Sequence, residues 1–562
     1  MGNRILKLFH QEIAGVHQAA FLIGFFTFIS QILALVRDRI LAAQFGAGLT
    51  LDIYYAAFRI PDLIYAAVAS LVSISVLIPF FSGIFEQKKE EAAHLMSTIF
   101  TVFLGLIVVI SGIFWVLMPH LTPLLMPGMK DPAVLDQLTH LARLLLLQPI
   151  CLGISNLLGV ITQISKRFFL YALSPILYNV SIIFGIVFFY PTLGMTGVVL
   201  GVILGGALHF LIQVPFVASR GVLPRITTKI DWKSVWMMFR LSIPRTLTLS
   251  ATNLELVFIT SFASLITTGS ISIFSFSNNL QSVPFAIVGV SYALAAFPTL
   301  SAFIARGERS EFIEHVTTAA RHIVFWSIPI TALFIVLRAQ IVRVILGSGS
   351  FNWDNTRLTA ACLALFTISL VAQGLELLFI RAYYAAGMTK KPLIANLSSS
   401  IVTIGAPFLL LMAFNTFPMF KYFIESTFRV EDIPGAGVLM LPLGFSIGTI
   451  LNTIVLWVMF ERDFGSLKRK VGRSIFTSFS AAVIGGFAAY VALSVAGNSL
   501  DLDTFGGITM QGILGGVAGI ATIILVFKLL GSVELGEVWK MFNQKMTRGD
   551  KVVVSEPEKL EV

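Results

Sequence analysis

Long apolar stretches, each about as long as a membrane-crossing helix, follow one another along almost the whole chain. A helix needs roughly 20 mostly apolar residues to cross a bilayer, and short polar loops separate stretches of that length here. The pattern predicts an all-α polytopic membrane protein. It has about fourteen transmembrane helices, at residues 17–43, 53–84, 93–118, 134–163, 169–190, 194–218, 234–266, 271–304, 312–337, 356–386, 393–416, 434–460, 472–496 and 507–530.

The loops between these stretches alternate in charge. One set holds most of the basic residues, namely Lys88, Lys89, Lys166, Arg167, Arg220, Arg225, Lys229, Arg306, Arg309, Lys390, Lys391, Lys468, Arg469, Lys470 and Arg473. The other set holds little beyond Lys130, Lys421 and Arg429. Because cytoplasmic loops are enriched in Lys and Arg, we expect both termini in the cytoplasm and an even number of spans.

Composition narrows the class of protein further. Hydrophobic residues make up 56% of the chain and charged residues 12%, with a mean hydropathy of +0.89. The net charge of +10 is explained by the basic loops and does not indicate nucleic acid. Cys151 and Cys362 lie in apolar runs, which argues against disulfides and cysteine-bound metals. With no nucleotide-binding loop and no paired histidines, we predict a transporter without catalytic residues, metal ligands or cofactors.

Two proline landmarks recur at nearly one spacing and indicate an internal repeat. "VLIPFFS" around Pro79 resembles "AAFPTLS" around Pro298, and "SPILYN" around Pro175 resembles "KPLIAN" around Pro392. Since six spans is an even number, two six-helix copies start on the same side, which makes the repeat parallel. The predicted domains are an N-terminal six-helix bundle at 1–220, a C-terminal six-helix bundle at 221–465, two extra transmembrane helices at 466–531, and a cytoplasmic amphipathic helix with a disordered tail at 532–562.

The tail after the last span carries one further helical pattern. Leu535, Val538, Trp539 and Phe542 fall on one face, which predicts a short helix lying on the inner membrane surface. A solvated tail without a task is the alternative.

Ionisable residues inside the apolar stretches concentrate in a few spans. Such a side chain costs about 2.5 kcal/mol or more at mid-bilayer, so it normally faces a cavity or a partner. A duplicated bundle places its substrate path between the halves. We therefore expect a polar cavity between the two halves, lined by these residues. The residues concerned are Arg37, Asp38, Arg39, Asp52, Arg59 and Asp62 in the first two spans, Arg240, Arg245 and Glu255 in the seventh, and Glu376 and Arg381 in the tenth.

Each of these charges has a functional and a structural interpretation. Arg37 and Arg59 are predicted to face the cavity, where a guanidinium can bind phosphate in a bidentate fork. Asp52 follows the "FGAG" turn at 45–48 and is placed either in the cavity or as the cap of the next helix. For Arg39 the alternative is snorkelling to an interface, and for Asp62 a local pair with Arg59. For Arg245 the two alternatives are a contact with the ligand and an ion pair with Glu376 or Glu255.

At these residues the sequence resembles a known family. "SQILALVRDRILAAQFGAGLTLDIYYAAFRIPDLI" resembles the first two helices of the MurJ (MviN) family, lipid II flippases of the multidrug/oligosaccharidyl-lipid/polysaccharide superfamily. The family pattern has Ser, Gly, Arg-Asp, Phe-Gly-Ala-Gly, Asp-Ala-Phe and Phe-x-x-Pro-Asn-Leu. It falls on Ser30, Ala34, Arg37–Asp38, Phe45–Gly48, Asp52–Tyr54 and Phe58–Leu63. "RAYYAAGMTKKP" and "TTGSISIFSFSNNLQSVPFAIVGVSYALAAFPTLS" resemble further family segments, so the resemblance covers nearly the whole chain.

The resemblance implies a function and a set of site residues. A flippase of this family moves a polyprenyl-pyrophosphate-linked peptidoglycan precursor from the inner to the outer leaflet by alternating access. A cationic cavity holds the pyrophosphate, and a groove toward the last two helices takes the lipid tail. The substrate-binding candidates are Arg37, Asp52, Arg59, Arg245, Ser30 and Asn279, and the structural or coupling candidates are Asp38, Glu255, Glu376 and Arg381.

The sequence departs from the family at three cationic positions. Gln31, Tyr65 and Asn279 stand where the family has arginine, and Asn278 replaces an acid. Arg59, Arg245 and Arg143 are candidates to compensate for the lost charge. The alternative is that the substrate differs.

Rival functions follow from these departures. One is a flippase for another polyprenyl-linked glycan, which the lost arginines favour. A cation-coupled drug exporter would prefer an acidic, aromatic cavity. A non-transporting scaffold in a cell-wall assembly complex is opposed by the retained Arg37 and Asp52. The resemblance implies the bacterial inner membrane, contacts with the lipid-linked substrate and membrane lipids, and possible cell-wall synthesis proteins as partners. Coupling to the membrane potential or to a monovalent ion stays open.

Overall fold

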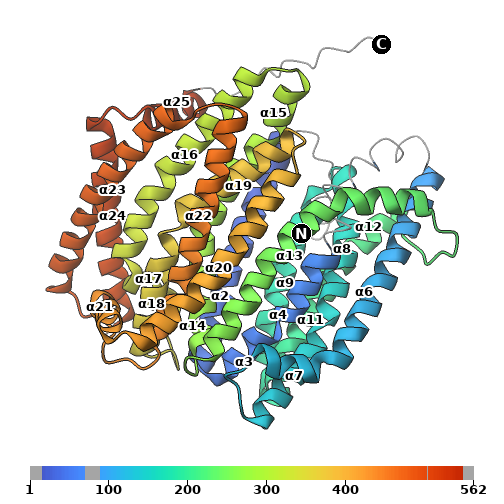
Figure 1. Cartoon of the computed structure of the whole chain (residues 1–562), viewed down its shortest axis with the longest axis horizontal. Helices are drawn as coiled ribbons and strands as arrows, with labels where there is room; N and C mark the ends of the chain where they lie inside the picture. The colour runs from blue at the N-terminus through green and yellow to red at the C-terminus, as the bar shows by residue number, and fades with distance from the viewer. Residues whose placement is uncertain (1–15, 70–76, 78–80, 82–88, 503, 548–562) are drawn as a thin grey trace.

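The chain folds into a bundle of long helices, several of which run the full height of the molecule (Figure 1). The structure is a computed structural model that describes residues 16–69, 77, 81, 89–502 and 504–547. No strand occurs among these residues. Helices satisfy their backbone hydrogen bonds within the segment, which is the physical requirement for a chain surrounded by lipid. The predicted all-α class is therefore confirmed.

Most elements of the first half of the chain lie on the right of Figure 1, and α2 lies near the middle. They are α2 (Val16–Phe45), α3 (Leu49–Ala57), α4 (Arg59–Ile64), the π-turn η1 (Tyr65–Ala69), α6 (Lys89–Leu125), α7 (Pro132–Leu145), α8 (Leu147–Ile164), α9 (Phe168–Phe184), the π-turn η3 (Gly185–Phe189), α10 (Tyr190–Leu193), α11 (Met195–Leu211) and α12 (Val214–Ser219).

The second half and the last helices form the remaining elements. They are α13 (Trp232–Ser264), α14 (Ser270–Phe285), the π-turn η4 (Ala286–Val290), α15 (Ser291–Ala305), α16 (Arg309–Val336), α17 (Arg338–Ile345), α18 (Trp353–Thr367), α19 (Leu370–Ala385), α20 (Lys390–Thr416), α21 (Pro418–Phe428), the 3₁₀ turn η5 (Ala436–Leu439), α22 (Met440–Asp463), α23 (Lys468–Gly497), α24 (Phe505–Leu529) and α25 (Val533–Thr547).

Most of the predicted spans coincide with helices of membrane-crossing length. Within the described residues, 11 helices are long and apolar enough to cross, and α18 with α19 makes up to 12 as a pair bent by 43°. The other two predicted spans, 17–43 and 53–84, fall on α2 and on α3, α4 and η1. The second of these continues beyond Ala69 into residues outside the described ranges. The structure is consistent with about fourteen spans.

Corresponding elements of the predicted repeat pack in the same way. α2 packs on α9 as α13 packs on α20, and α9 packs on α11 as α20 packs on α22. The π-turns η1 and η4, in the second and eighth spans, begin at Tyr65 and Ala286. π-turns are rare and mark places where a helix changes course. This likeness supports the predicted duplication, while the boundaries at 220, 465 and 531 stay predictions.

The last helices lie at one edge of the bundle. α23 packs on α16 and α24, and α25 turns back over the basic ends of these helices (Figure 1). Leu535 and Val538 of α25 pack against an apolar cluster that includes Phe325 and Phe527, whereas Trp539 is 66% exposed. The predicted single apolar face is thus divided. Its first part docks on the protein, and Trp539 points away from it.

Candidate functional site

The Arg-Asp pair of α2 forms a polar cluster inside the apolar bundle. Arg37 donates from Nε and Nη2 to Asp38 Oδ1, at 3.0 and 2.8 Å. Asp38 is only 2% exposed, so its charge depends on this partner. Arg37 is therefore not a free phosphate ligand in this conformation. It is half of a buried ion pair.

Amide side chains from two other spans complete this cluster. Arg37 Nη1 donates to Asn179 Oδ1 on α9 at 3.1 Å, and Asn179 Nδ2 donates to the Ser30 hydroxyl at 3.2 Å. Asn279 Nδ2 on α14 donates to Asp38 Oδ2 at 2.9 Å. Ser30, Arg37, Asp38 and Asn279 were predicted as site residues, and the structure brings all four together. The contact between Asp38 and Asn279 joins the two halves of the chain.

Arg59 makes a second contact between the halves. Its Nη2 donates to the Ser275 hydroxyl on α14 at 3.4 Å, and it interacts electrostatically with Asp62. Arg59 Nε is buried and has no hydrogen-bond partner within the described part of the chain. A buried guanidinium with an unused donor has capacity for one further acceptor. This geometry is therefore compatible with a local pair between Asp62 and Arg59 and also with a phosphate contact at Arg59.

Asp52 caps a helix, but not the one expected from the sequence. It lies in the first turn of α3, whose own N-cap is Gly48. Its carboxylate instead accepts from the backbone N–H of Gly269 at 2.5 Å, the N–H of Ser272 at 2.8 Å and the Ser272 hydroxyl at 2.6 Å. These donors belong to the N-terminus of α14, in the other half. A carboxylate at a helix N-terminus is stabilised by unpaired N–H groups and by the helix dipole.

The backbones of the two halves also approach closely beside Asp52. Ser350 N donates to Ala43 O at 2.8 Å. Gly349 has φ +58 and Gly269 has φ +94, and a Cβ at either would lie 2.2 or 2.4 Å from the carbonyl oxygen of Ala43 or Ala47. Only glycine fits such positions. The "FGAG" turn at 45–48 therefore packs closely against the opposite half.

Arg39 also makes a contact between the two halves of the chain. Its Nη1 donates to the carbonyls of Val344 at 2.5 Å and Ile345 at 3.2 Å, the last residues of α17. Its guanidinium also lies 5.2 Å from the ring centre of Phe505, the first residue of α24. A cation at the C-terminus of a helix is favourable because the last carbonyls have no partners of their own.

A separate cavity lies within the second half. Its volume is about 440 Å³, which is enough for a small ligand, and Glu255, Glu376 and Arg381 are in its wall. Ser400 donates to Glu255 Oε1 at 2.5 Å, and Asn452 Nδ2 donates to Glu376 Oε1 at 2.9 Å. The sequence left open whether Arg245 forms an ion pair with Glu255 or Glu376. Arg245 lies on α13, and its side chain is outside the described residues.

Two of the three neutral positions, Tyr65 and Asn279, make hydrogen bonds in the structure, and the surroundings of Arg143 are also defined. Tyr65 accepts a hydrogen bond from Asn156 Nδ2 at 2.9 Å, and Asn279 binds Asp38 as described above. Arg143 donates to Trp115 O at 2.9 Å and stacks on the Trp115 ring at 4.3 Å. It is therefore held against α6, and among the described contacts none joins it to the Arg37 cluster. The proposal that Arg143 compensates for a lost arginine is not supported.

Sequence reasoning missed the serines of α14. Ser272 and Ser275 contact Asp52 and Arg59, and both are buried, as are Ser270 and Ser277. The signal was present in "SISIFSFSNN", where hydroxyl groups recur inside an apolar span. Buried hydroxyls in a membrane helix need partners, and here the charges of the first two spans supply two of them.

Comparisons with known proteins extend these observations. A family model described as lipid II flippase MurJ matches residues 41–501. A probable lipid II flippase MurJ of Buchnera aphidicola is 28% identical over 384 residues, covering 67% of this chain and 74% of that protein. A probable lipid II flippase MurJ of Rhizobium tropici is 24% identical over 546 residues, covering 93% and 96%.

Solved structures show the same fold. A structure titled as lipid II flippase MurJ in an inward closed conformation aligns with a TM-score of 0.70 and 21% identity, covering 94% of this chain and 100% of that one. An inward-facing multidrug transporter of the MATE family aligns with a TM-score of 0.62 and 15% identity, covering 78% and 96%. At these identities the likeness concerns the fold alone.

Proposed function

The chain belongs to the MurJ family of lipid II flippases, and we propose that it moves lipid II from the inner to the outer leaflet by alternating access. The observation that carries this proposal is the family match over residues 41–501, which spans both halves of the bundle. The protein is a multi-pass membrane transporter of the bacterial inner membrane, with a lipid-linked substrate. We further propose cytoplasmic termini, in accord with the basic loops, and cell-wall synthesis proteins as partners.

The contacts between the halves support a specific resting state. Asp52, Ser350 and Gly349 join the halves beside the loops that are poor in Lys and Arg. With the orientation proposed above, this is the outer end, so the protein is closed to the outside. Alternating access then requires the hydrogen bonds between Asp52 and the N-terminus of α14 to break when the outer end opens.

We propose that Arg37, Arg59 and Arg245 provide the cationic side of the substrate path, with Ser30, Asn279 and Asp52 beside them. The unused donor of Arg59 supports a role in binding the pyrophosphate. Asp38 neutralises Arg37 in the closed state. Substrate binding at Arg37 therefore requires the guanidinium to exchange Asp38 for phosphate or to bind through its remaining donors.

Coupling to a monovalent ion or to the membrane potential is assigned to the cavity in the second half. Glu255 and Glu376 are both in its wall, and ionisable residues inside a membrane bundle often mark the path of an ion or a proton. Glu255→Gln and Glu376→Gln should each lower transport while leaving membrane abundance unchanged. Unchanged transport in both variants would remove this cavity from the mechanism.

The function is tested by complementation of a bacterial strain depleted of its own lipid II flippase. We expect growth with the wild-type chain and loss of growth with Arg59→Ala at equal membrane abundance. Failure of the wild-type chain to support growth, with normal abundance, would favour a flippase for another polyprenyl-linked glycan. Gln31, Tyr65 and Asn279 are the observation behind that second candidate, because they remove positive charge where the family has arginine. Transport of labelled lipid II in vesicles distinguishes the two.

A further inference from the structure

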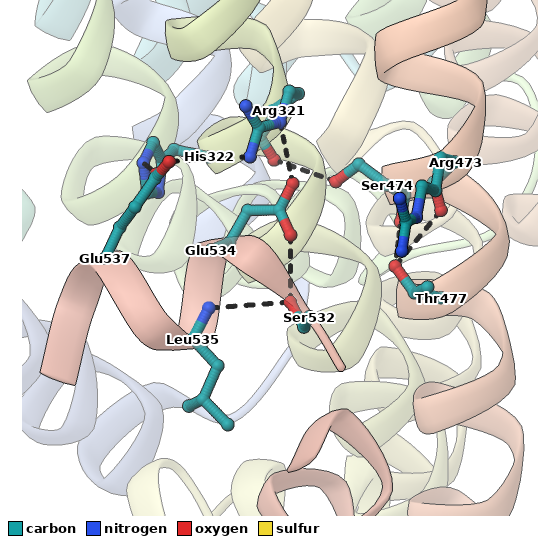
Figure 2. A network of polar contacts seen from close by, with 9 residues as sticks. All are labelled: Arg321, His322, Arg473, Ser474, Thr477, Ser532, Glu534, Leu535 and Glu537. Carbon is teal, nitrogen blue, oxygen red and sulfur yellow. Dashed lines mark hydrogen bonds and ion pairs between the residues drawn. The ribbon is translucent and has the colours of Figure 1, made fainter. Parts of the chain in front are cut away.

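A basic pocket lies where α16, α23 and the start of α25 meet, at the end of the bundle that carries the basic loops (Figure 2). Its volume is about 240 Å³, and its wall includes Arg321, Lys470 and Arg473. The hydroxyl-bearing residues Ser474 and Thr477 lie beside Arg473 on α23. The pocket is separate from the polar contacts between the two halves.

Contacts between α25 and α16 hold one wall of the pocket, which contains Arg321 and Glu534. Arg321 Nε lies 2.8 Å from Glu534 Oε1, and His322 Nε2 lies 2.9 Å from Glu537 Oε2. Ser532 donates to the other oxygen of Glu534 at 2.8 Å, as Figure 2 shows. Burial opposes ionisation of Glu534, but hydrogen bonds from its own backbone N–H, Arg321 and Ser532 outweigh burial and lower its pKa. This wall is therefore built before any ligand arrives.

The charges in the pocket do not cancel. Arg321 is paired with Glu534, and Lys470 is paired with Glu314. Arg473 makes no ion pair within the described ranges, and it is exposed. Among the lining residues, three cations face two carboxylates, and the lining cation without an ion pair is Arg473, whose planar guanidinium suits phosphate oxygens.

An apolar surface runs from this charge into the membrane. Phe476, Phe479 and Val483 follow Arg473 along α23 on one helical face, and they are 69%, 62% and 55% exposed. In a membrane-spanning helix, such a face contacts acyl chains. A cation at the membrane surface above an apolar stripe matches the two parts of a phospholipid, and basic pockets between helices on the cytoplasmic side recognise anionic head groups.

We propose that this pocket binds one anionic phospholipid of the inner leaflet, with its phosphate on Arg473 and its acyl chains along Phe476, Phe479 and Val483. The lipid would lie against α16, α23 and α25 together. It would therefore stabilise the attachment of the last helices to the bundle. This inference concerns a bound lipid and does not depend on which substrate the protein transports.

The test is native mass spectrometry of the full chain titrated with phosphatidylglycerol. Arg473→Ala should weaken binding of the first lipid about tenfold or more, because a hydrogen-bonded charge pair is lost. Arg473→Lys should weaken lipid binding less, because lysine keeps the positive charge but loses the two-pronged hydrogen bonding of the guanidinium. Lys528→Ala is the matched control, because Lys528 is an exposed cation in the last turn of α24 outside the pocket wall.

Four results would overturn the proposal. Equal phosphatidylglycerol binding by wild type and Arg473→Ala would exclude Arg473 as the ligand. An equal loss in Lys528→Ala would show attraction to surface charge in general. Phosphatidylcholine with the same acyl chains binding as tightly as phosphatidylglycerol, or inorganic phosphate displacing the lipid at equal concentration, would show that an anionic lipid is not what the pocket selects.

Discussion

The contact between Asp52 and the N-terminus of α14 should set how readily the outer end opens. Asp52→Ala removes a carboxylate that accepts three hydrogen bonds and leaves the N–H groups of Gly269 and Ser272 without that partner. Asp52 is 3% exposed, so its carboxylate is shielded from water in the closed state. Charge-assisted hydrogen bonds contribute about 1.5–3 kcal/mol each and are not additive, so we take about 3 kcal/mol for the whole contact.

That free energy corresponds to a shift of roughly 100-fold in the equilibrium between closed and open outer ends. A minor open state of about 1% would become about half of the population. Asp52→Asn keeps one acceptor oxygen and loses the charge. It should shift the equilibrium about tenfold, or about 1.4 kcal/mol.

Pulsed electron paramagnetic resonance in lipid nanodiscs measures this shift directly. Spin labels at Asp136 on α7 and Asp354 on α18 report the distance between the halves, because both positions are exposed. Cys151 and Cys362, the only two cysteines of the chain, are first replaced by alanine. Asp52→Ala should move the distance distribution toward longer separations, and Asp52→Asn should give an intermediate distribution.

Asp131→Asn is the matched control. Asp131 also caps a helix, accepting from Ala133 N at 2.9 Å, but both residues belong to the same half. It should leave the distance distribution unchanged. If Asp52→Ala gave the wild-type distribution, or if Asp131→Asn moved it as far, the cap between the halves would not hold the outer end closed.

Arg37→Ala should lower membrane abundance, because the buried Asp38 loses its partner at a cost of about 3–5 kcal/mol. Arg37→Gln combined with Asp38→Asn should restore abundance on immunoblots without restoring transport. Restored transport in this double variant would exclude Arg37 from the substrate path. The Glu534 pKa is lowered, so its stabilisation of α25 is complete above the ordinary carboxylate pKa and is lost as pH falls through the lowered value. A spin label on α25 should gain mobility in that acidic range, and unchanged mobility there would contradict this. Reporter fusions after Lys391 and near Asn352 should report opposite sides of the membrane, and the same side for both would contradict the predicted topology.

The apolar pattern was sufficient to predict the helices and their approximate ends. A transmembrane helix satisfies its own backbone and needs a minimum apolar length, so both requirements are local properties of the sequence. The second span was the least regular of these. Its described part is divided into α3, α4 and η1, and Pro61, which has no backbone N–H to donate to the preceding turn, follows the break at Phe58.

The partners of the buried charges were not predictable in the same way. The sequence identified Arg37, Asp38, Asp52 and Asn279 as unusual residues, because charge and amide groups are costly in lipid wherever they occur. Arg37 and Asp38 are neighbours that pair with each other, but their other partners and those of Asp52 lie between 142 and 241 residues away along the chain, and the number of combinations is large. The serines of α14 were a further signal that sequence reasoning missed, because buried hydroxyls in a membrane helix need partners.

Asp52 and Arg39 show most clearly what each level determines. The sequence alone determined that each needs a counterpart, since an ionised group in an apolar span must be neutralised or hydrogen-bonded. Only the tertiary structure decided that Asp52 caps α14 and that Arg39 binds the end of α17. A helix terminus offers unpaired backbone groups whatever its side chains are. No sequence pattern marks which terminus will be used, because packing of the two halves chooses it.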